Sequence, residues 1–378
     1  MDRAIMKELC KWYDSNDGRI LFVCGAPKVG KSWLISELCR NKQANNIFVV
    51  SDVDIYRNAE KLRRIILRLR ADEKLSNARI IVESSVVDRI IIEQKIADEE
   101  YIKFIQVHPM SLHEYKNIMI RRYNYSDIEL VKMYLIIGGL PQCVDYFYRY
   151  GDFTGTRNIQ QTILEGICTS KDGRKRTILY SLPKQLQPNR TGFKYRQIKQ
   201  NARQREYGES FQCLERKGII YRIKYLELGN EIAKINYNVY IYDVGLMSLL
   251  TGVDERGVLE NENIFMVYDN LLVKNYVIQE LYAMNANAKY TINYWHKHRA
   301  KAKLPLILRG VGRNVTIPVI LNVGKSYTRC IKSFAEQTDV EKICMINLLD
   351  KSATLTSVEG IYVYALYLWE FHKILSIL

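Results

Sequence analysis

Residues 25–32, which read GAPKVGKS, constrain the fold of this chain more than any other segment. They match the pattern G-x-x-x-x-G-K-[ST] at every fixed position and directly follow the largely apolar run RILFVC, residues 19–24. Glycines in such a loop let the backbone turn so that several N–H groups point at one anion. The segment therefore predicts a phosphate-binding loop between a strand and a helix.

The residue types in this loop indicate its ligands. Lys31 places a positive charge beside phosphates, and the hydroxyl of Ser32 is a ligand for Mg²⁺. ATP and Mg²⁺ are therefore the expected cofactors. The expected nucleotide-binding residues are Gly25, Ala26, Pro27, Lys28, Val29, Gly30, Lys31, Ser32 and Trp33.

The spacing of apolar residues predicts alternating strands and helices around the loop. The predicted strands are 19–24, 47–50, 79–82 and 101–107, and the predicted helices are 3–13, 31–40 and 58–71. This alternation implies a parallel sheet whose ligand lies at the carboxyl ends of the strands. Because a domain typically holds ~100–200 residues, the 378 residues of the chain predict two or three domains.

Different patterns follow the predicted sheet. Residues 111–170 are predicted to be helical, with a break at Gly138-Gly-Leu-Pro141. Two helices at 177–186 and 193–218, followed by a strand at 219–228, have the order of a winged helix. A mixed α/β pattern then returns, with a helix at 268–283 and strands near 291–295, 304–308, 315–321 and 342–347.

The positive charge of the chain is concentrated in one segment. The net charge is +15, and residues 171–205 hold eleven lysines and arginines against the single acid Asp172, a net charge of +10. A segment this basic favours a polyanion, with DNA as the first candidate, while a solvated linker is the alternative. The expected nucleic-acid contacts are Lys194, Arg196, Lys199, Arg203 and Arg205.

Cysteine spacing and hydropathy exclude other classes of protein. The eight cysteines include no C-x-x-C pair, so neither a zinc site nor a disulfide framework is indicated. No apolar run approaches the ~18 residues that a membrane span needs, and acids occur where a secretion signal has none. We expect a soluble cytoplasmic protein without a membrane partner.

Six parts of the chain, in order, resemble bacterial AAA-type P-loop ATPases that carry a winged helix and a C-terminal domain of the PD-(D/E)XK nuclease-like fold. They are FVCGAPKVGKSWLISEL, VHPMSLHEY, YLIIGGLPQCVDYF, SLPKQLQPNRTGFKYRQIKQNARQREYGESFQCLERKGIIYRI, NVYIYDVGLMSLLTG, and the pair 268–281 with 293–322. The resemblance implies an α/β P-loop NTPase core with a parallel sheet at 1–110, a helical segment at 111–170, a winged helix at 171–255 and a degenerate nuclease-like α/β domain at 256–378.

The resemblance leaves open which acid serves the metal. Family members typically end one strand with Asp-Glu, where the Asp supports Mg²⁺ and the Glu polarises the attacking water. Under the preferred alignment this pair has become Ser51-Asp52, so Asp52 is expected to act as both metal and catalytic residue. Alternatively, the acid-bearing strand is 79–83 and ends at Glu83, and Asp54 is a third candidate.

The nuclease-like domain departs from the family pattern. Relatives place a Glu on the helix, E-x-D on one strand and E-x-K on the next, an arrangement that holds a divalent metal in true nucleases. Here the corresponding positions are Asp269, Lys303-Leu-Pro305 and Ile320-Leu-Asn322. Because such a metal needs oxygen ligands, no nuclease activity is expected.

These patterns together predict an ATP-binding protein of the AAA type with slow hydrolysis, which couples its nucleotide state to DNA or to an unknown protein partner. One alternative is a nucleotide-gated binding switch without turnover. Another, from a different class, is a structural or DNA-binding protein whose phosphate loop is vestigial. Nucleotide affinity separates the last from the others, and turnover separates the first two.

Overall fold

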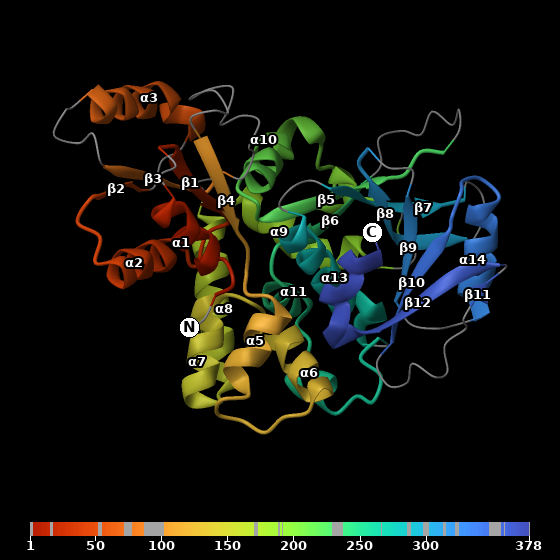
Figure 1. Ribbon diagram of the computed structural model, residues 1–378. Helices are drawn as coiled ribbons and strands as arrows, with labels where there is room; N and C mark the ends of the chain where they lie inside the picture. The colour runs from red at the N-terminus through yellow and green to blue at the C-terminus, as the bar shows by residue number, and fades with distance from the viewer. Residues whose placement is uncertain are drawn as a thin grey trace.

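Two β-sheets joined by helices make up the protein (Figure 1). The computed structural model describes all residues except 1–2, 16–17, 52–54, 72–77, 87–101, 170–172, 188–189, 191, 229–236, 266, 286–288, 298–301, 313–314, 322–324, 348–356, 359 and 378. Within the described ranges, no helix combines the length and the apolar character needed to cross a membrane.

The N-terminal sheet contains the strand that precedes the phosphate loop. Its strands are β1 (Ile20–Gly25), β2 (Ile47–Val50), β3 (Arg79–Ser84) and β4 (Ile102–Val107). They pair in the order β2-β3-β1-β4, and every pair is parallel, which confirms the predicted parallel sheet. β1 is buried at all six positions, as expected for a strand with neighbours on both sides and helices on both faces.

The helices predicted around this sheet are present. They are α1 (Met6–Asp14), α2 (Lys31–Lys42) and α3 (Ile55–Ala71). Leu9 and Trp12 of α1 are buried in the apolar cluster that also holds Leu34 and Leu38 of α2. These side chains recur at helical spacing, which is the pattern that predicted both helices.

Four helices follow the sheet and lie below it in Figure 1. They are α5 (Leu112–Met119), α6 (Asp127–Ile137), α7 (Pro141–Tyr150) and α8 (Phe153–Cys168). Capping boxes at Ser111 and Ser126 start α5 and α6, each with a glutamate three residues on. Gly138 ends α6 with a positive φ of 76°, and Pro141 starts α7, so the predicted helix break is confirmed.

The region predicted as a winged helix has a shorter second helix than expected. It contains α9 (Arg174–Gln185), the 3₁₀ turn η3 (Tyr195–Gln197), α10 (Gln204–Arg216), β5 (Ile220–Tyr225) and β6 (Tyr237–Ile241). The prediction of one helix over 193–218 was wrong in its first half. Asn201 adopts a left-handed φ of 64° and Arg203 is extended, so helical geometry begins only at Gln204.

The second sheet has eight strands in the order β11-β12-β10-β9-β8-β7-β5-β6. Beyond β5 and β6 they are β7 (Tyr290–His296), β8 (Lys303–Gly310), β9 (Thr316–Leu321), β10 (Lys342–Asn347), β11 (Ser357–Val358) and β12 (Ile361–Tyr367). The strands predicted near 291, 304, 315 and 342 are therefore confirmed. β5 pairs in parallel with β7, so β5 and its antiparallel partner β6 extend this sheet.

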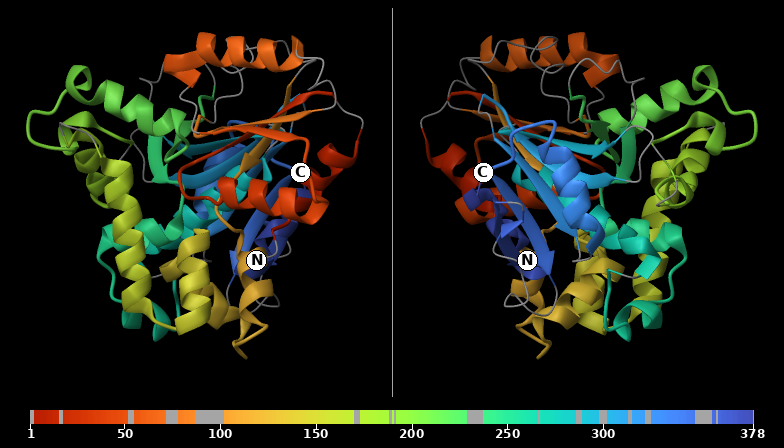
Figure 2. Two further views of the ribbon diagram at one scale, coloured as in Figure 1. Left: turned by 90° about the vertical axis from the view of Figure 1, so that its left-hand side faces the viewer. Right: turned by 90° about the vertical axis from the view of Figure 1, so that its right-hand side faces the viewer.

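The remaining helices of the described residues are drawn from teal to dark blue in the two views of Figure 2. They are α11 (Val244–Thr251), α12 (Glu255–Leu259), η4 (Val267–Asn270), α13 (Leu271–Met284), α14 (Lys325–Ala335) and η5 (Leu368–Ile377). α13 confirms the helix predicted at 268–283, although its first residues form η4. One apolar cluster runs from Leu9 in α1 to Ile374 in η5, so the two sheets share a core.

The turn between β6 and α11 connects the second sheet to the junction between α6 and α7. The fully buried carboxylate of Asp243 accepts hydrogen bonds from the backbone N–H groups of Gly139 and Leu246, at 2.8 and 3.1 Å. Gly245 packs against the end of α6, where a Cβ atom would lie 2.4 Å from the carbonyl oxygen of Ile137 and 2.7 Å from the amide nitrogen of Gln160. The junction after α6 and the turn after β6 are therefore closely packed against each other.

We predict that Gly245→Ala destabilises the protein by about 1–3 kcal/mol, because the added methyl group overpacks this contact. Gly166→Ala is the matched control, since Gly166 lies inside α8 and a methyl group added there would meet no atom within 4 Å. The control should be neutral or stabilising by about 0.5–1 kcal/mol. Urea unfolding of both variants measures the difference, and equal stabilities would contradict the tight packing at Gly245.

Candidate nucleotide site

The predicted phosphate loop joins β1 to α2 at the carboxyl end of the strand. Gly30 has a left-handed φ of 95° and is the N-cap of α2. Gly25 is packed so closely that a Cβ atom there would lie 2.3 Å from the carbonyl oxygen of Val107. Glycine is therefore required at both fixed positions of the motif. The first turn of α2 contains no acid, so no negative charge there opposes the binding of an anion at the amino end of this helix.

The side chain of Lys31 folds over the loop. Only 8% of this residue is exposed, and its Nζ donates hydrogen bonds of 3.0 Å to the carbonyl oxygens of Gly25 and Ala26. Cys24 lies buried at the end of β1, where burial raises the pKa of its thiol to about 12, and the charge of Lys31 lowers it. The thiol is therefore neutral at this end of the strand.

Two residues that are distant in sequence from the loop, Arg3 and Tyr242, donate hydrogen bonds to its backbone. The guanidinium of Arg3 donates to the carbonyl oxygens of Val29 and His108, at 3.1 and 2.8 Å, and pairs with Glu114 at 3.2 Å. The hydroxyl of Tyr242, next to Asp243, donates to the carbonyl oxygen of Pro27 at 3.0 Å. The loop is thus held by the residue segment before α1 and by the turn that follows β6 of the second sheet.

Ser32 and Glu83 lie together at the mouth of the loop. The Ser32 hydroxyl donates a 2.7 Å hydrogen bond to a carboxylate oxygen of Glu83. The sheet explains the contact, since β3 pairs with β1 and places Glu83 directly beside Val23. A hydroxyl and a carboxylate at this distance are the oxygen donors that Mg²⁺ prefers.

Asp52 and Asp54, the other two candidate acids, lie outside the described residues. The strand that precedes them, β2, pairs with β3 on the side away from β1. Because neighbouring strands lie ~4.8 Å apart, the end of β2 lies about twice as far from the phosphate loop as the end of β3. The order of the strands therefore favours Glu83 as the acid beside Ser32.

A cavity of about 550 Å³ lies over the loop. Among the described residues its charged lining consists of Arg3, Lys28, Lys31, Glu83, Asp145 and Arg149. Asp145 and Arg149 form an ion pair along α7, with 2.9 Å between the carboxylate oxygen and Nε. Trp33, which was predicted to contact nucleotide, also lines this cavity and is partly exposed. Cations outnumber acids in the lining, which suits an anionic ligand.

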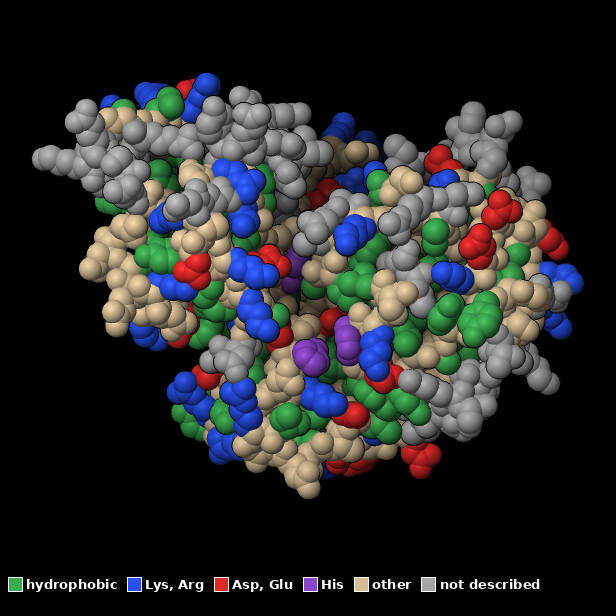
Figure 3. Space-filling view, in the orientation of Figure 1, with side chains coloured by type: hydrophobic (Ala, Val, Ile, Leu, Met, Phe, Trp, Pro, Cys, Tyr) green, Lys and Arg blue, Asp and Glu red, His purple; other side chains and the backbone are tan. Residues whose placement is uncertain are grey.

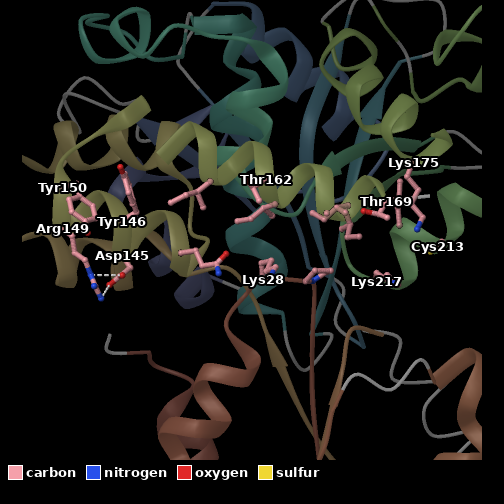
Figure 4. Close-up of a pocket in the computed structure, with 18 residues that line it drawn as sticks. Lys28, Asp145, Tyr146, Arg149, Tyr150, Thr162, Thr169, Lys175, Cys213 and Lys217 are labelled. Carbon is pink, nitrogen blue, oxygen red and sulfur yellow. Dashed lines mark hydrogen bonds and ion pairs between the residues drawn. The ribbon is translucent and has the colours of Figure 1, made fainter. Parts of the chain in front are cut away.

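A second cavity, of about 830 Å³, continues from the first along α7 and α8. The two cavities share Lys28, Gln142, Asp145 and Arg149. Figure 4 shows Lys28 near the middle of the second cavity, Arg149, Tyr146 and Tyr150 at one end, and Thr169, Lys175 and Lys217 at the other. The combined space is ample for a ligand larger than a phosphate group, since small-molecule sites span ~300–1,000 Å³.

The predicted nucleic-acid residues lie in and around η3 and α10. The side chains of Arg196, Lys199, Arg203 and Arg205 are exposed. Lys194 is half-buried, and its backbone N–H donates to the side-chain oxygen of Gln185 at 2.8 Å, which ties the segment to α9. α10, drawn in green, lies at the outer edge of the molecule (Figure 2).

The positions that correspond to a nuclease metal site do not gather carboxylates. Lys303 and Pro305 both line one small cavity beside β7 and β8, and Ile320 is fully buried in the core. Asp269 lies in η4 with a positive φ of 52°, and Asn322 is outside the described residues. Among described residues, no group of three or more His, Cys, Asp or Glu is placed to hold a metal ion.

Sequence patterns did not single out Arg3, Tyr242 or Arg149. Arg3 lies in the first predicted helix region and Arg149 in a generic amphipathic helix, so neither has a motif of its own. Tyr242 is part of the segment NVYIYDVGLMSLLTG, whose resemblance to a family signature was the available signal. The roles of Arg3 and Tyr242 depend on contacts with residues far away along the chain, as in the hydrogen bond from Tyr242 to Pro27.

Comparisons with known proteins add little to this geometry. A family described as a domain of unknown function (DUF8612) matches residues 128–257, which is about a third of the chain. The structure of the Aeropyrum pernix ORC1 protein in complex with DNA is similar over 66% of this chain and 91% of that chain, with 9% sequence identity and a TM-score of 0.30. No curated protein matches the chain. The site must therefore be interpreted from its own residues.

Proposed function

We propose that this chain binds ATP with Mg²⁺ at the loop of residues 25–33 and hydrolyses it slowly, as a P-loop protein of the AAA type. The main support for the proposal is the hydrogen bond between the Ser32 hydroxyl and the Glu83 carboxylate, which lies beside the glycine-containing phosphate loop. A vestigial loop would have no need of an acid at this position. The alternative of a switch without turnover uses the same residues.

The residues present fit both cofactors. Gly25 and Gly30 leave the backbone N–H groups of the loop and the amino end of α2 accessible to phosphates, and Lys31 supplies a cation. Ser32 and Glu83 supply oxygen ligands for Mg²⁺. The adjoining cavity along α7 and α8 offers space for the nucleoside.

The same residues explain why hydrolysis should be slow. Bound Mg²⁺ would neutralise charge on the phosphates, and Lys31 would orient them. A water molecule must also be held in line for attack. If Glu83 serves the metal, the remaining carboxylate among the described residues that line the cavity is Asp145, which is already paired with Arg149. Water is therefore poorly activated in this proposal.

Lys31→Ala should weaken Mg·ATP binding by about tenfold or more, because a hydrogen bond to a charged group contributes ~1.5–3 kcal/mol. Lys42→Ala is the matched control, since Lys42 lies in the last turn of the same helix and pairs with Asp14. Isothermal titration calorimetry measures both variants. Equal affinity in Lys31→Ala and the parent would leave the vestigial-loop alternative in place.

Glu83→Gln should lower Mg-dependent turnover by ~10²-fold or more, because an amide cannot replace a carboxylate beside the metal. Asp52→Asn should change turnover far less if the strand order governs the site. Steady-state phosphate release measures both variants. The reverse pattern would assign the acid to Asp52, and a parent rate at or above the ~10 s⁻¹ typical of enzymes would contradict slow hydrolysis.

We further propose that the basic segment around η3 and α10 binds DNA through its phosphates. The supporting observation is the exposure of four cationic side chains, at 196, 199, 203 and 205, on a segment that is tied to α9 through Lys194. Such contacts release condensed counterions, so the affinity for DNA depends steeply on salt. They contribute affinity without sequence preference.

Replacing Arg196, Lys199 and Arg203 together with Ala should reduce the slope of log K against log salt by roughly three units, about 0.9 for each phosphate that is no longer neutralised. The matched control is Lys61, Arg64 and Arg68 to Ala on α3, which removes the same charge from another exposed surface, seen at the upper left of Figure 3. Gel shifts across a salt series measure both. An unchanged slope in the first triple variant would leave the segment a solvated linker.

A further inference from the structure

A small cavity in the second sheet gathers cations at the positions that correspond to a nuclease metal site. Its volume is about 170 Å³, and it lies between β7, β8, α13 and the chain that follows α9. Its titratable lining among the described residues is Arg190, Lys274, His296 and Lys303, together with tyrosines, and no Asp or Glu is included. The two positions that would carry the E-x-D carboxylates, 303 and 305, both line it.

Lys274 is a half-buried cation that lines this cavity. Among the described residues, its Nζ makes one long contact of 3.4 Å, to the backbone carbonyl oxygen of Asp269. Burial lowers the pKa of Lys274 to about 8, the charge of Asp269 opposes this, and the charge of Lys303 lowers it further. The described lining of the cavity therefore offers this ammonium no carboxylate partner.

Tyr294 supplies a second polar group without a partner. Tyr294 is only 5% exposed, and its hydroxyl is buried with no hydrogen-bond partner among the described residues. It lies on β7 where the register with β8 shifts between Asn293 and Trp295. A bulge of this kind redirects a side chain and recurs beside functional sites. The result is a buried hydroxyl in the wall of a cationic cavity.

We propose that this cavity binds a phosphate group, which accepts hydrogen bonds from Lys274 and from the Tyr294 hydroxyl. Leaving a buried donor such as the Tyr294 hydroxyl unsatisfied costs ~1–3 kcal/mol, so a ligand that accepts its hydrogen bond and also pairs with the half-buried Lys274 is favoured. An oxyanion does so, whereas a metal ion would be repelled by Lys274 and Lys303. The charge of this lining is thus opposite to that of a metal centre, which needs carboxylates.

The size of the cavity limits the ligand to a single phosphate group inside. A whole nucleotide needs a site of at least ~300 Å³, which exceeds the volume present. Arg190 and Lys303 are exposed at the cavity and can contact further negative charge outside it. Arg190 belongs to the basic segment 171–205, so a phosphate-terminated strand that follows this segment would reach the cavity. Free phosphate and a terminal nucleic-acid phosphate share the required chemistry.

Calorimetric titration of the full chain with inorganic phosphate tests the site, in a Lys31→Ala background that removes the phosphate loop as a competitor. Lys274→Met should lower phosphate affinity by about tenfold or more, and Tyr294→Phe by several-fold, since a charged hydrogen bond contributes more than a neutral one. Lys289→Met is the control, because Lys289 is exposed just before β7 and outside the cavity.

A proton readout separates binding at Lys274 from a general loss of stability. A bound anion should raise the pKa of Lys274 again. At pH 8.5 the Lys31→Ala variant should therefore take up protons when it binds phosphate. Adding Lys274→Met to this variant should abolish the proton uptake. Among the described residues, the other charged or titratable groups around it are Arg190, Lys303, Asp269, His296, Tyr240, Tyr294 and Tyr327. Titrations in buffers of different ionisation enthalpy measure the uptake.

Single-stranded oligonucleotides with and without a 5′-phosphate identify the source of the group. Tighter binding of the phosphorylated strand, abolished in Lys274→Met, would assign the cavity to nucleic-acid ends, and equal binding of both strands would assign it to free phosphate. The proposal is overturned if phosphate does not bind in the Lys31→Ala background, or if Lys274→Met and Tyr294→Phe both bind phosphate as that background does.

Discussion

The buried carboxylate of Asp243 is the interaction on which the arrangement of the whole molecule depends. Burial raises its pKa to about 6, while the backbone N–H groups of Gly139, Leu246 and Gly245 lower it. A carboxylate is tolerated inside a protein only when such donors surround it. Because the donors come from the junction after α6 and from α11, this one group sets the position of the second sheet relative to the helices.

The same turn reaches the phosphate loop. Tyr242 precedes Asp243 and donates to Pro27, while Val244 follows it and donates through its backbone N–H to Gln279 of α13. The loop that would hold nucleotide, the helices below it and the second sheet therefore share one rigid element. A displacement of the loop would therefore have to break these hydrogen bonds or move the turn after β6 with it.

Local sequence patterns predicted most elements well. The strands around β1 and the caps of α6 and α7 follow from apolar runs, glycine and proline, which act over a few residues. The helix predicted over 193–218 failed at its start because Asn201 takes a left-handed conformation that apolar spacing does not reveal. The pairing of β5 with β7 was also not predicted, since residues 224 and 293 are far apart along the chain.

The sequence by itself determined the phosphate loop, its glycines and the helix behind it, because these depend on backbone geometry within eight residues. For the acid beside the metal it favoured Asp52, with Glu83 and Asp54 as alternatives. Only the order of the strands placed Glu83 beside Ser32, because parallel neighbours bring their carboxyl ends together. The cationic cavity likewise exists only in three dimensions, since packing assembles Arg190, Lys274, Tyr294 and Lys303 from separate elements.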